Sequence, residues 1–131
     1  MSDVVLPLRH RRAWIVCSLI LVAVVVLGSL IPGGSAPKVP MGDKWQHFLA
    51  YLGLALWFCG GVRRSAFLWV AGGLLALGGL MEVLQALITT ARSADLRDML
   101  ANSLGIATGL IIAWLGLAGW ALKVEGWLGA R

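Results

Sequence analysis

Long apolar runs separated by short polar stretches dominate the pattern of the chain. Residues 13–31 contain nineteen positions without a charge, and a run of this length is typical of a helix that crosses a bilayer. Further apolar runs cover residues 43–62, 65–88 and 95–122. The pattern therefore predicts an all-α fold, a four-transmembrane-helix bundle. A signal peptide is the alternative for residues 13–31, but its apolar region is usually about 7–15 residues long, and Pro37 directly after the small residues 34–36 disfavours cleavage.

Turn and capping residues divide these runs into a single membrane domain. Proline and glycine at 32–34 end the first run, Gly60 and Gly61 end the second, and Arg63 and Arg64 form a basic turn before the third. Asp43, with Gln46 three residues later, fits the N-cap and the capping-box position of the second helix. We expect a leader at 1–12, a membrane domain at 13–122 and a short tail at 123–131.

Composition and charge agree with a membrane location. Of the 131 residues, 60% are hydrophobic and 13% are charged, too few charges to cover a soluble domain of this size. The net charge of +5 comes from cations scattered at the ends of the runs, with no basic stripe, so no nucleic-acid partner is expected. Cys17 and Cys59 lie in apolar runs near the end predicted to face the cytoplasm, where thiols stay reduced, so we expect buried free thiols.

The distribution of arginine and lysine predicts the orientation of the bundle. Seven cations lie in the leader, in the turn at 63–64 and in the tail, whereas four lie on the opposite side. The positive-inside rule then places both termini in the cytoplasm and the remaining loops outside. The seven are Arg9, Arg11, Arg12, Arg63, Arg64, Lys123 and Arg131, and the four are Lys38, Lys44, Arg92 and Arg97.

Polar residues in three of the predicted helices share a face and a depth. Asp43, His47 and Tyr51 recur every four residues and so lie on one side of the second helix. Glu82 and Gln85 share a face of the third helix. At about 1.5 Å per residue, Glu82 lies roughly 9 Å below the outer end of that helix. The fourth helix carries Asp95, Asp98 and Asn102 on one face, above a ridge of small residues at 101, 105 and 109 that suits close packing.

Each of these residues also has a purely structural interpretation. Asp43 and Asp95 suit helix caps, and Asp98 suits the dipole of the first turn. His47 and Tyr51 suit the membrane–water interface, and the side chain of Lys44 can extend to it. Gln85 and Asn102 can form hydrogen bonds with neighbouring helices. Arg92 can hold its own loop in place through an ion pair. Glu82 is hardest to explain in this way, because a carboxylate in an apolar helix needs a cationic or hydrogen-bonding partner. We therefore expect Glu82 to be the centre of a site.

At these positions the chain resembles the VanZ-like family of bacterial integral membrane proteins, over about residues 38–116. The motifs are Asp43-Lys44-x-x-His47-Phe48-x-x-Tyr51, Glu82-x-x-Gln85, and Arg92-Ser93 followed by Asp95, Asp98, Asn102, Gly105 and Gly109. Residues 89–91 depart from the turn expected before Arg92. The resemblance implies the bacterial cytoplasmic (inner) membrane and a role in the cell envelope, because one member is linked to teicoplanin resistance.

Two functions of different classes fit the polar residues. In the first, an outward-facing site binds a lipid-linked or peptidoglycan-related head group, with Asp43, Lys44, Tyr51, Gln85, Arg92, Asp95, Asp98 and Asn102 as binding residues. In the second, a membrane-embedded enzyme acts on an envelope lipid or phosphate head group, with Glu82 or His47 as general base and Arg92 and Lys44 on developing negative charge. A divalent metal on Asp95, Asp98 and Glu82 suits hard oxygen ligands, but the spacing matches no standard metal motif, so the cofactor stays open.

Overall fold

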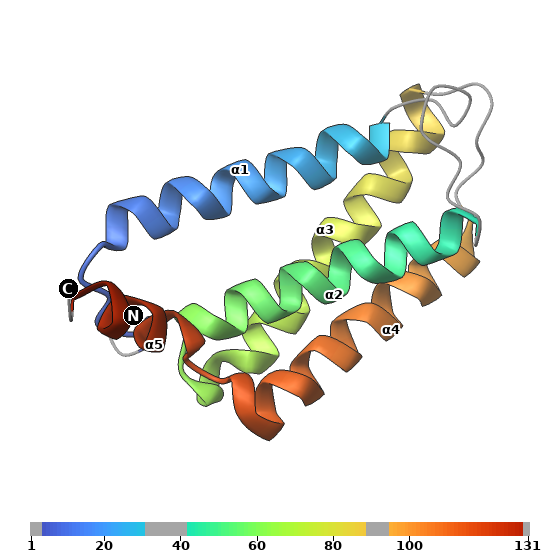
Figure 1. Ribbon diagram of the computed structural model, residues 1–131. Helices are drawn as coiled ribbons and strands as arrows, with labels where there is room; N and C mark the ends of the chain where they lie inside the picture. Colours follow the sequence, from blue (N-terminus) through green and yellow to red (C-terminus); the bar gives the residue numbers. More distant parts are fainter. Residues whose placement is uncertain (1–3, 31–41, 89–94, 130–131) are drawn as a thin grey trace.

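The computed structural model describes residues 4–30, 42–88 and 95–129, and within them the chain is helical, apart from one isolated antiparallel bridge between Val5 and Val62 (Figure 1). A 3₁₀ turn, Arg64–Ala66, leads into α3, and a π-helical segment, Ala113–Leu117, extends α4. The α-helices are α1 (Arg11–Leu30), α2 (Asp43–Gly61), α3 (Phe67–Ile88), α4 (Leu96–Ile112) and α5 (Trp120–Gly129).

Three of these helical stretches are long and apolar enough to cross a membrane. They are α1, α3 together with its leading turn, and α4 together with the π segment. Many of their leucine, isoleucine and valine side chains point outward, as lipid contact requires. The second predicted span, α2, runs beside them but begins with Asp43, Lys44, Gln46 and His47 and is not among these stretches. The membrane assignment and the all-α fold are therefore supported, with three such stretches in the described chain.

Helices α2 and α4 pack more closely against each other than any other two helices of the described chain. A Cβ added at Gly105 would overlap the backbone oxygen of Phe48, and one at Gly109 would lie 2.6 Å from the Cβ of Ala55 and 3.0 Å from the oxygen of Leu52. Glycine at both positions lets the two backbones touch, which favours dispersion contacts in lipid. The small-residue ridge expected on the fourth helix is thus the surface that holds α2.

Helix α3 completes the core behind this pair. Tyr51, Leu54 and Ala55 of α2, Leu74 of α3 and Ile106 of α4 form a buried cluster. Of the four glycines in the two glycine pairs of α3, one faces a neighbouring helix closely. Gly72, Gly73 and Gly79 have no neighbour within 4 Å of an added Cβ, whereas Gly78 faces Asn102.

Helix α1 is the outermost element, and none of its residues is buried (Figure 1). It approaches α2 through Trp14 and Ser18, whose hydroxyl accepts a 2.8 Å hydrogen bond from Nε1 of Trp57. An apolar cavity of about 320 Å³ lies beside this contact, between α1 and α2, and its lining includes Leu19 and Val22. Leu21, Val22 and Val25 of α1 pack against the edge of the core, so the helix contacts its neighbours along its length without burying any of its residues.

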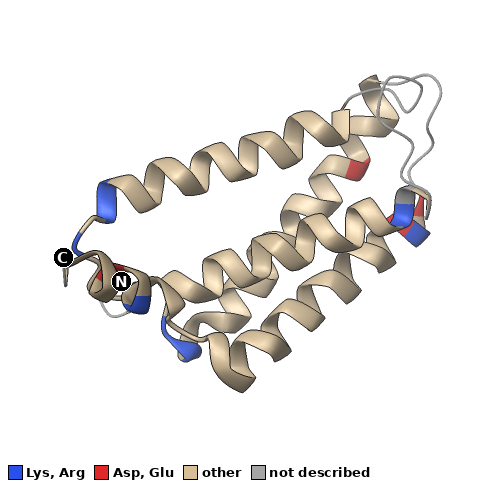
Figure 2. Cartoon of the chain, viewed as in Figure 1, with Lys and Arg blue, Asp and Glu red and all other residues tan. Residues whose placement is uncertain are grey.

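The described ends of the chain meet at one end of the bundle, where most of the basic residues gather (Figure 2). The backbone N–H of Leu6 donates to the oxygen of Gly61 at 3.0 Å, which joins the leader to the end of α2. Glu125 of α5 accepts hydrogen bonds from the backbone N–H of Arg9 at 2.6 Å and of His10 at 2.8 Å, and from Nε1 of Trp14 at 2.9 Å. The leader and α5 are thus parts of one folded structure.

The expected boundaries of the last helix are wrong. A single helix at 95–122 and a tail at 123–131 were predicted, but the chain turns at Gly119, whose φ is 68°. This left-handed conformation suits glycine and ends the π segment, after which α5 begins at Trp120. Trp120 then folds back over Gly60 and donates from Nε1 to the oxygen of Leu56 at 2.9 Å.

Two smaller expectations also differ from the structure. Gly42, and not Asp43, occupies the N-cap of α2, and no side chain among those described caps this helix end. Cys17 and Cys59 are both free, as expected, but Cys17 is exposed on the outer surface of α1 and only Cys59 is buried.

Candidate functional site

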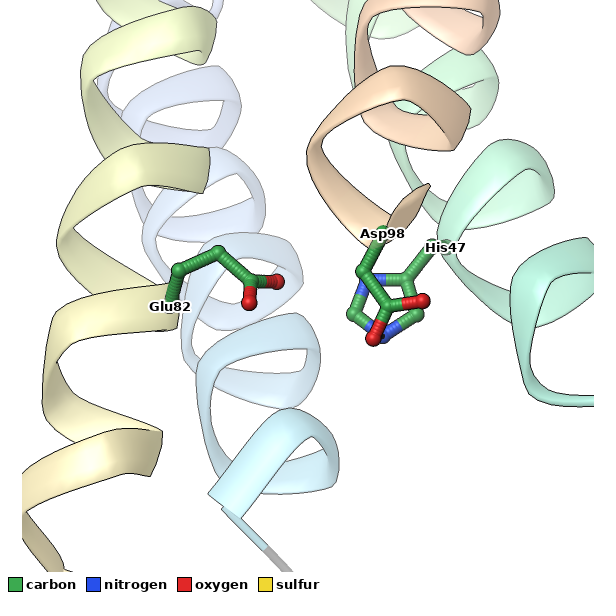
Figure 3. Close-up of side chains that lie close together, drawn as sticks. All are labelled: His47, Glu82 and Asp98. Atoms are coloured by element: carbon green, nitrogen blue, oxygen red, sulfur yellow. Dashed lines mark ion pairs between the residues drawn. The ribbon is translucent and has the colours of Figure 1, made fainter. Parts of the chain in front are cut away.

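Three polar side chains, one from each of the core helices α2, α3 and α4, meet at the end of the bundle opposite α5. His47 comes from α2, Glu82 from α3 and Asp98 from α4, and all three are buried. One nitrogen or oxygen atom of each lies within 4.8 Å of the others. In Figure 3 the carboxylate of Glu82 extends away from α3 towards Asp98 and His47. Helices that are far apart in sequence therefore place two carboxylates and one imidazole in a common cluster, called the polar cluster below.

Glu82 is the least satisfied member of this cluster. Its Oε2 accepts a hydrogen bond of 3.2 Å from the backbone N–H of Asp95, at the start of α4. Its Oε1 is buried and has no hydrogen-bond partner among the described residues. Sequence patterns cannot reveal the Asp95 donor, because it belongs to the backbone. Half of the Glu82 carboxylate is thus held in place, and the other half faces the cluster.

His47 is held by α4 on both sides of its ring. Its Nδ1 lies 3.1 Å from Oδ1 of Asn102, and its Nε2 lies 3.6 Å from Oδ2 of Asp98. Because the amide oxygen only accepts, this contact is a hydrogen bond in the ring forms that carry a proton on Nδ1. In the neutral ring, the lone pair of Nε2 then points towards the carboxylates of the cluster.

Lys44 and Asp95 form the exposed rim of the polar cluster. The Nζ of Lys44 lies 3.4 Å from Oδ1 of Asp98 and 3.5 Å from Oδ2 of Asp95, and the Lys44 and Asp95 side chains are 49% and 43% exposed. Asp95 also caps α4, because its Oδ1 accepts a 2.8 Å hydrogen bond from the N–H of Arg97. That bond, with Lys44 nearby, lowers the pKa of Asp95 although partial burial opposes the shift.

Tyr51 lies below the polar cluster, one turn deeper in α2 than His47. Its side chain is 1% exposed, and its hydroxyl has no hydrogen-bond partner among the described residues. Gly78 of α3 lies opposite, where an added Cβ would be 3.5 Å from this hydroxyl and 3.1 Å from Nδ2 of Asn102. The absence of a side chain at Gly78 therefore lets α3 approach Tyr51 and Asn102 closely.

Other predicted site residues are placed differently or lie outside the described part. The Nε2 of Gln85 donates to the backbone oxygen of Ser29 at 2.6 Å and so connects α3 to the end of α1. Arg92 lies outside the described residues, and of Asp43 only the backbone, at the start of α2, is described. The polar cluster itself consists of His47, Glu82 and Asp98. Lys44 and Asp95 form its rim, and Asn102 and Tyr51 lie next to it inside the bundle.

No protein-family model, no curated protein and no solved structure matches this chain. The resemblance to the VanZ-like family therefore rests on the motifs alone. The chemistry of the polar cluster follows from its own groups. Its carboxylates and imidazole can accept protons or hydrogen bonds or hold a cation, and Lys44 can attract an anionic group at the rim.

Proposed function

We propose that this protein is a VanZ-like integral protein of the bacterial inner membrane whose polar cluster binds the head group of an envelope lipid. The head group would be lipid-linked or related to peptidoglycan. It would enter past Lys44 and Asp95 and bond to Glu82, Tyr51 and Asn102 inside. Because the hydroxyl and amide groups of such head groups both donate and accept hydrogen bonds, they complement these side chains.

The observation that supports this proposal most is a pair of buried polar atoms, Oε1 of Glu82 and the hydroxyl of Tyr51, that have no hydrogen-bond partner within the described part of the chain. A buried polar group without a partner costs about 1–3 kcal/mol in proteins, and a charged one costs more. Two such groups in one region lower the stability of the protein, which a purely structural role does not explain. They are explained if a ligand supplies the missing hydrogen bonds.

The proposed topology has four spans, with α2 as the fourth and both termini in the cytoplasm. Several features support it. Helix α2 packs between its neighbours, and the described ends of the chain lie together at an end of the bundle rich in basic residues (Figure 2). The backbones of Arg9 and Arg63 bond to Glu125 and to Val4 at this end. The excess of cations there suits the cytoplasmic side. The polar cluster would then open towards the outer leaflet, where envelope precursors are used.

An enzyme acting on a lipid phosphate or related head group is the second candidate. It is favoured by the His47 ring, whose Nε2 lies 3.6 Å from Asp98 while Asn102 orients Nδ1. An imidazole held in this way can act as a general base, and Lys44 can stabilise negative charge at the rim. Glu82 would be the alternative base.

Lipid retention by matched variants tests the proposal. Wild-type protein and the isosteric variant Glu82→Gln are purified in mild detergent, and the bound lipids are extracted and identified by mass spectrometry. We expect a specific lipid at about one per chain in the wild type and at least tenfold less in Glu82→Gln at equal yield. Ser103→Ala is the control, because Ser103 bonds only to the oxygen of Met99 in its own helix, at 2.8 Å.

Three outcomes distinguish the possibilities. Equal lipid retention by wild type and Glu82→Gln would show that the polar cluster does not bind lipid. Loss of yield or of thermal stability in Glu82→Gln, with lipid loss in proportion, would assign Glu82 a structural role. Release of phosphate or of the head group from the retained lipid by the wild type, abolished in His47→Gln, would favour the enzyme.

A further inference from the structure

We propose that His47, Glu82 and Asp98 bind one divalent transition-metal ion, with zinc or manganese as the matching class. The site would use Nε2 of His47 and one carboxylate oxygen from each acidic residue. It involves the same polar cluster as the proposed function, but it does not require that a lipid head group binds there.

The geometry is close to that of a three-ligand metal site. The three ligand atoms lie within 4.8 Å of one another. Ligands at about 2.1 Å from a tetrahedral metal are separated by about 3.4 Å, so the atoms need to approach by about 1 Å or a little more. Rotation of the Glu82 side chain about its own bonds supplies this movement, since Oε1 has no competing partner among the described residues.

The groups around the ligands suit metal binding as well. A metal-binding histidine usually donates its other N–H to an oxygen, and Nδ1 of His47 has this partner in Oδ1 of Asn102 at 3.1 Å. A ligating carboxylate is usually hydrogen-bonded too, and Oε2 of Glu82 accepts from the N–H of Asp95 at 3.2 Å. In a neutral ring, Nε2 of His47 remains as a metal ligand beside Oδ2 of Asp98, at 3.6 Å, and Oε1 of Glu82 has no partner among the described residues.

The charge of the polar cluster and its rim also calls for a cation. Glu82, Asp98 and Asp95 are three carboxylates, and two basic residues of the described part of the chain, Lys44 and His47, lie within ion-pair distance of them. With a neutral His47 ring, the described groups carry excess negative charge at a low-dielectric position. A divalent ion between His47 and the two buried carboxylates would remove most of this excess.

The donor set determines which ions suit the site. Magnesium and calcium prefer oxygen ligands alone, whereas an imidazole nitrogen with carboxylates suits zinc, manganese or iron. Three protein ligands leave at least one coordination position for water or for a ligand atom, as in catalytic zinc sites. The same ion would thus offer a bound anionic group an additional partner.

Metal titration of the full-length protein tests the proposal without any added lipid. Protein purified in detergent is stripped with EDTA and dialysed against ZnCl₂ or MnCl₂, and bound metal is measured per chain. Cobalt(II) titration adds an absorption spectrum that reports nitrogen and oxygen ligands. We expect about one ion per chain, a rise in Tm, and a Kd at least 100-fold weaker in both Glu82→Gln and Asp98→Asn.

The control is again Ser103→Ala, which should bind as the wild type does. Less than 0.1 ion per wild-type chain, or no cobalt spectrum, would overturn the proposal even if every variant failed to fold. Binding of normal strength in a folded Glu82→Gln and Asp98→Asn would overturn it as well. Because no lipid is added, failure here leaves the lipid-retention result unaffected, and failure of lipid retention leaves the metal stoichiometry unaffected.

Discussion

The imidazole of His47 and the amide of Asn102 lie 3.1 Å apart and join α2 to α4 inside the polar cluster. Asn102 is 1% exposed, so this contact is shielded from competing polar groups of the solvent or the head-group layer. It fixes the orientation of the ring and directs Nε2 towards Asp98. The position of the histidine therefore depends on a residue that does not itself titrate.

Removing this amide should both destabilise the pair of helices and loosen the ring. Asn102→Ala leaves Nδ1 of His47 without an acceptor, and the expected loss in the free energy of unfolding is about 1–3 kcal/mol. Metal affinity should fall by about 10–100-fold, as is typical when the partner of a ligating histidine is lost. Thermal unfolding and zinc titration measure the two effects, with Ser103→Ala as the control. Unchanged zinc affinity in a folded Asn102→Ala would show that the amide does not position the ring.

The hydroxyl of Tyr51 should cost stability when no ligand is bound. It is buried and has no partner among the described residues, so Tyr51→Phe is expected to stabilise the delipidated protein by about 1 kcal/mol. The same substitution should lower lipid retention severalfold, because the ligand loses a hydrogen bond. Unfolding in detergent before and after delipidation provides the comparison. A large destabilisation in the delipidated state would reveal that the hydroxyl is already satisfied.

The contact between α2 and α4 should tolerate no side chain at its closest point. Gly105→Ala places a methyl group against the backbone oxygen of Phe48, which forces the helices apart at an expected cost of about 1–3 kcal/mol. Gly72→Ala is the matched control, because nothing lies within 4 Å of its Cβ and alanine favours the helix. Melting temperatures of the two variants test the difference. Equal effects would contradict the backbone contact.

Glu125 should make the end of the bundle sensitive to acid. Burial raises the pKa of this carboxyl, but hydrogen bonds from the backbone of His10 and Arg9 and from the indole of Trp14 outweigh it, so the pKa is lowered from 4.5. A lowered pKa contributes stability above pH 4.5 that is lost as the pH falls through the folded value. The Tm of the wild type should thus fall as the pH drops below 4.5. Glu125→Gln should have a lower Tm at pH 7 and a flatter profile, with Ser103→Ala as the control. If acidification lowered the Tm of Glu125→Gln by as much as that of the wild type, the acid effect would come from other groups.

The proposed orientation can be measured by cysteine labelling in a background that carries Cys17→Ala and Cys59→Ala. A membrane-impermeant maleimide should label Ser35→Cys in intact cells and Ser2→Cys only after lysis, because the loop after α1 would face outward and the leader inward. The reverse pattern would invert the topology and place the polar cluster on the cytoplasmic side.

Local pattern in the sequence was enough for most helices and for the faces that meet. Recurrence every three or four residues placed His47, Tyr51 and Asn102 on inward faces, because helical geometry alone determines which residues share a face. The contacts between helices were harder to predict from the sequence. Whether a glycine contacts a neighbouring helix depends on the shape of both helices. Gly105 contacts α2, whereas an added Cβ at Gly72 or Gly73 of α3 would meet no described atom within 4 Å.

The break at Gly119 and the role of Glu125 were missed for a related reason. Residues 113–122 are apolar and continue the pattern of the fourth helix, and glycine within an apolar run is common in membrane helices. The chain turns at the positive φ of Gly119, and Trp120 then packs against Gly60 of α2, a contact that local spacing does not signal. Glu125 likewise bonds to residues more than a hundred positions away, which no local spacing signals.

The polar first turns of α2 also bear on how the chain enters the membrane. Helix α2 emerges from the ribosome before α4, whose Asp98 and Asn102 neutralise or bond the Lys44 and His47 side chains. During synthesis these groups therefore reach the bilayer without their partners, at a time when inserting them into hydrocarbon is costly. In the proposed four-span topology, α2 would therefore complete its insertion late, together with α4, when the glycine contact between the two helices can form.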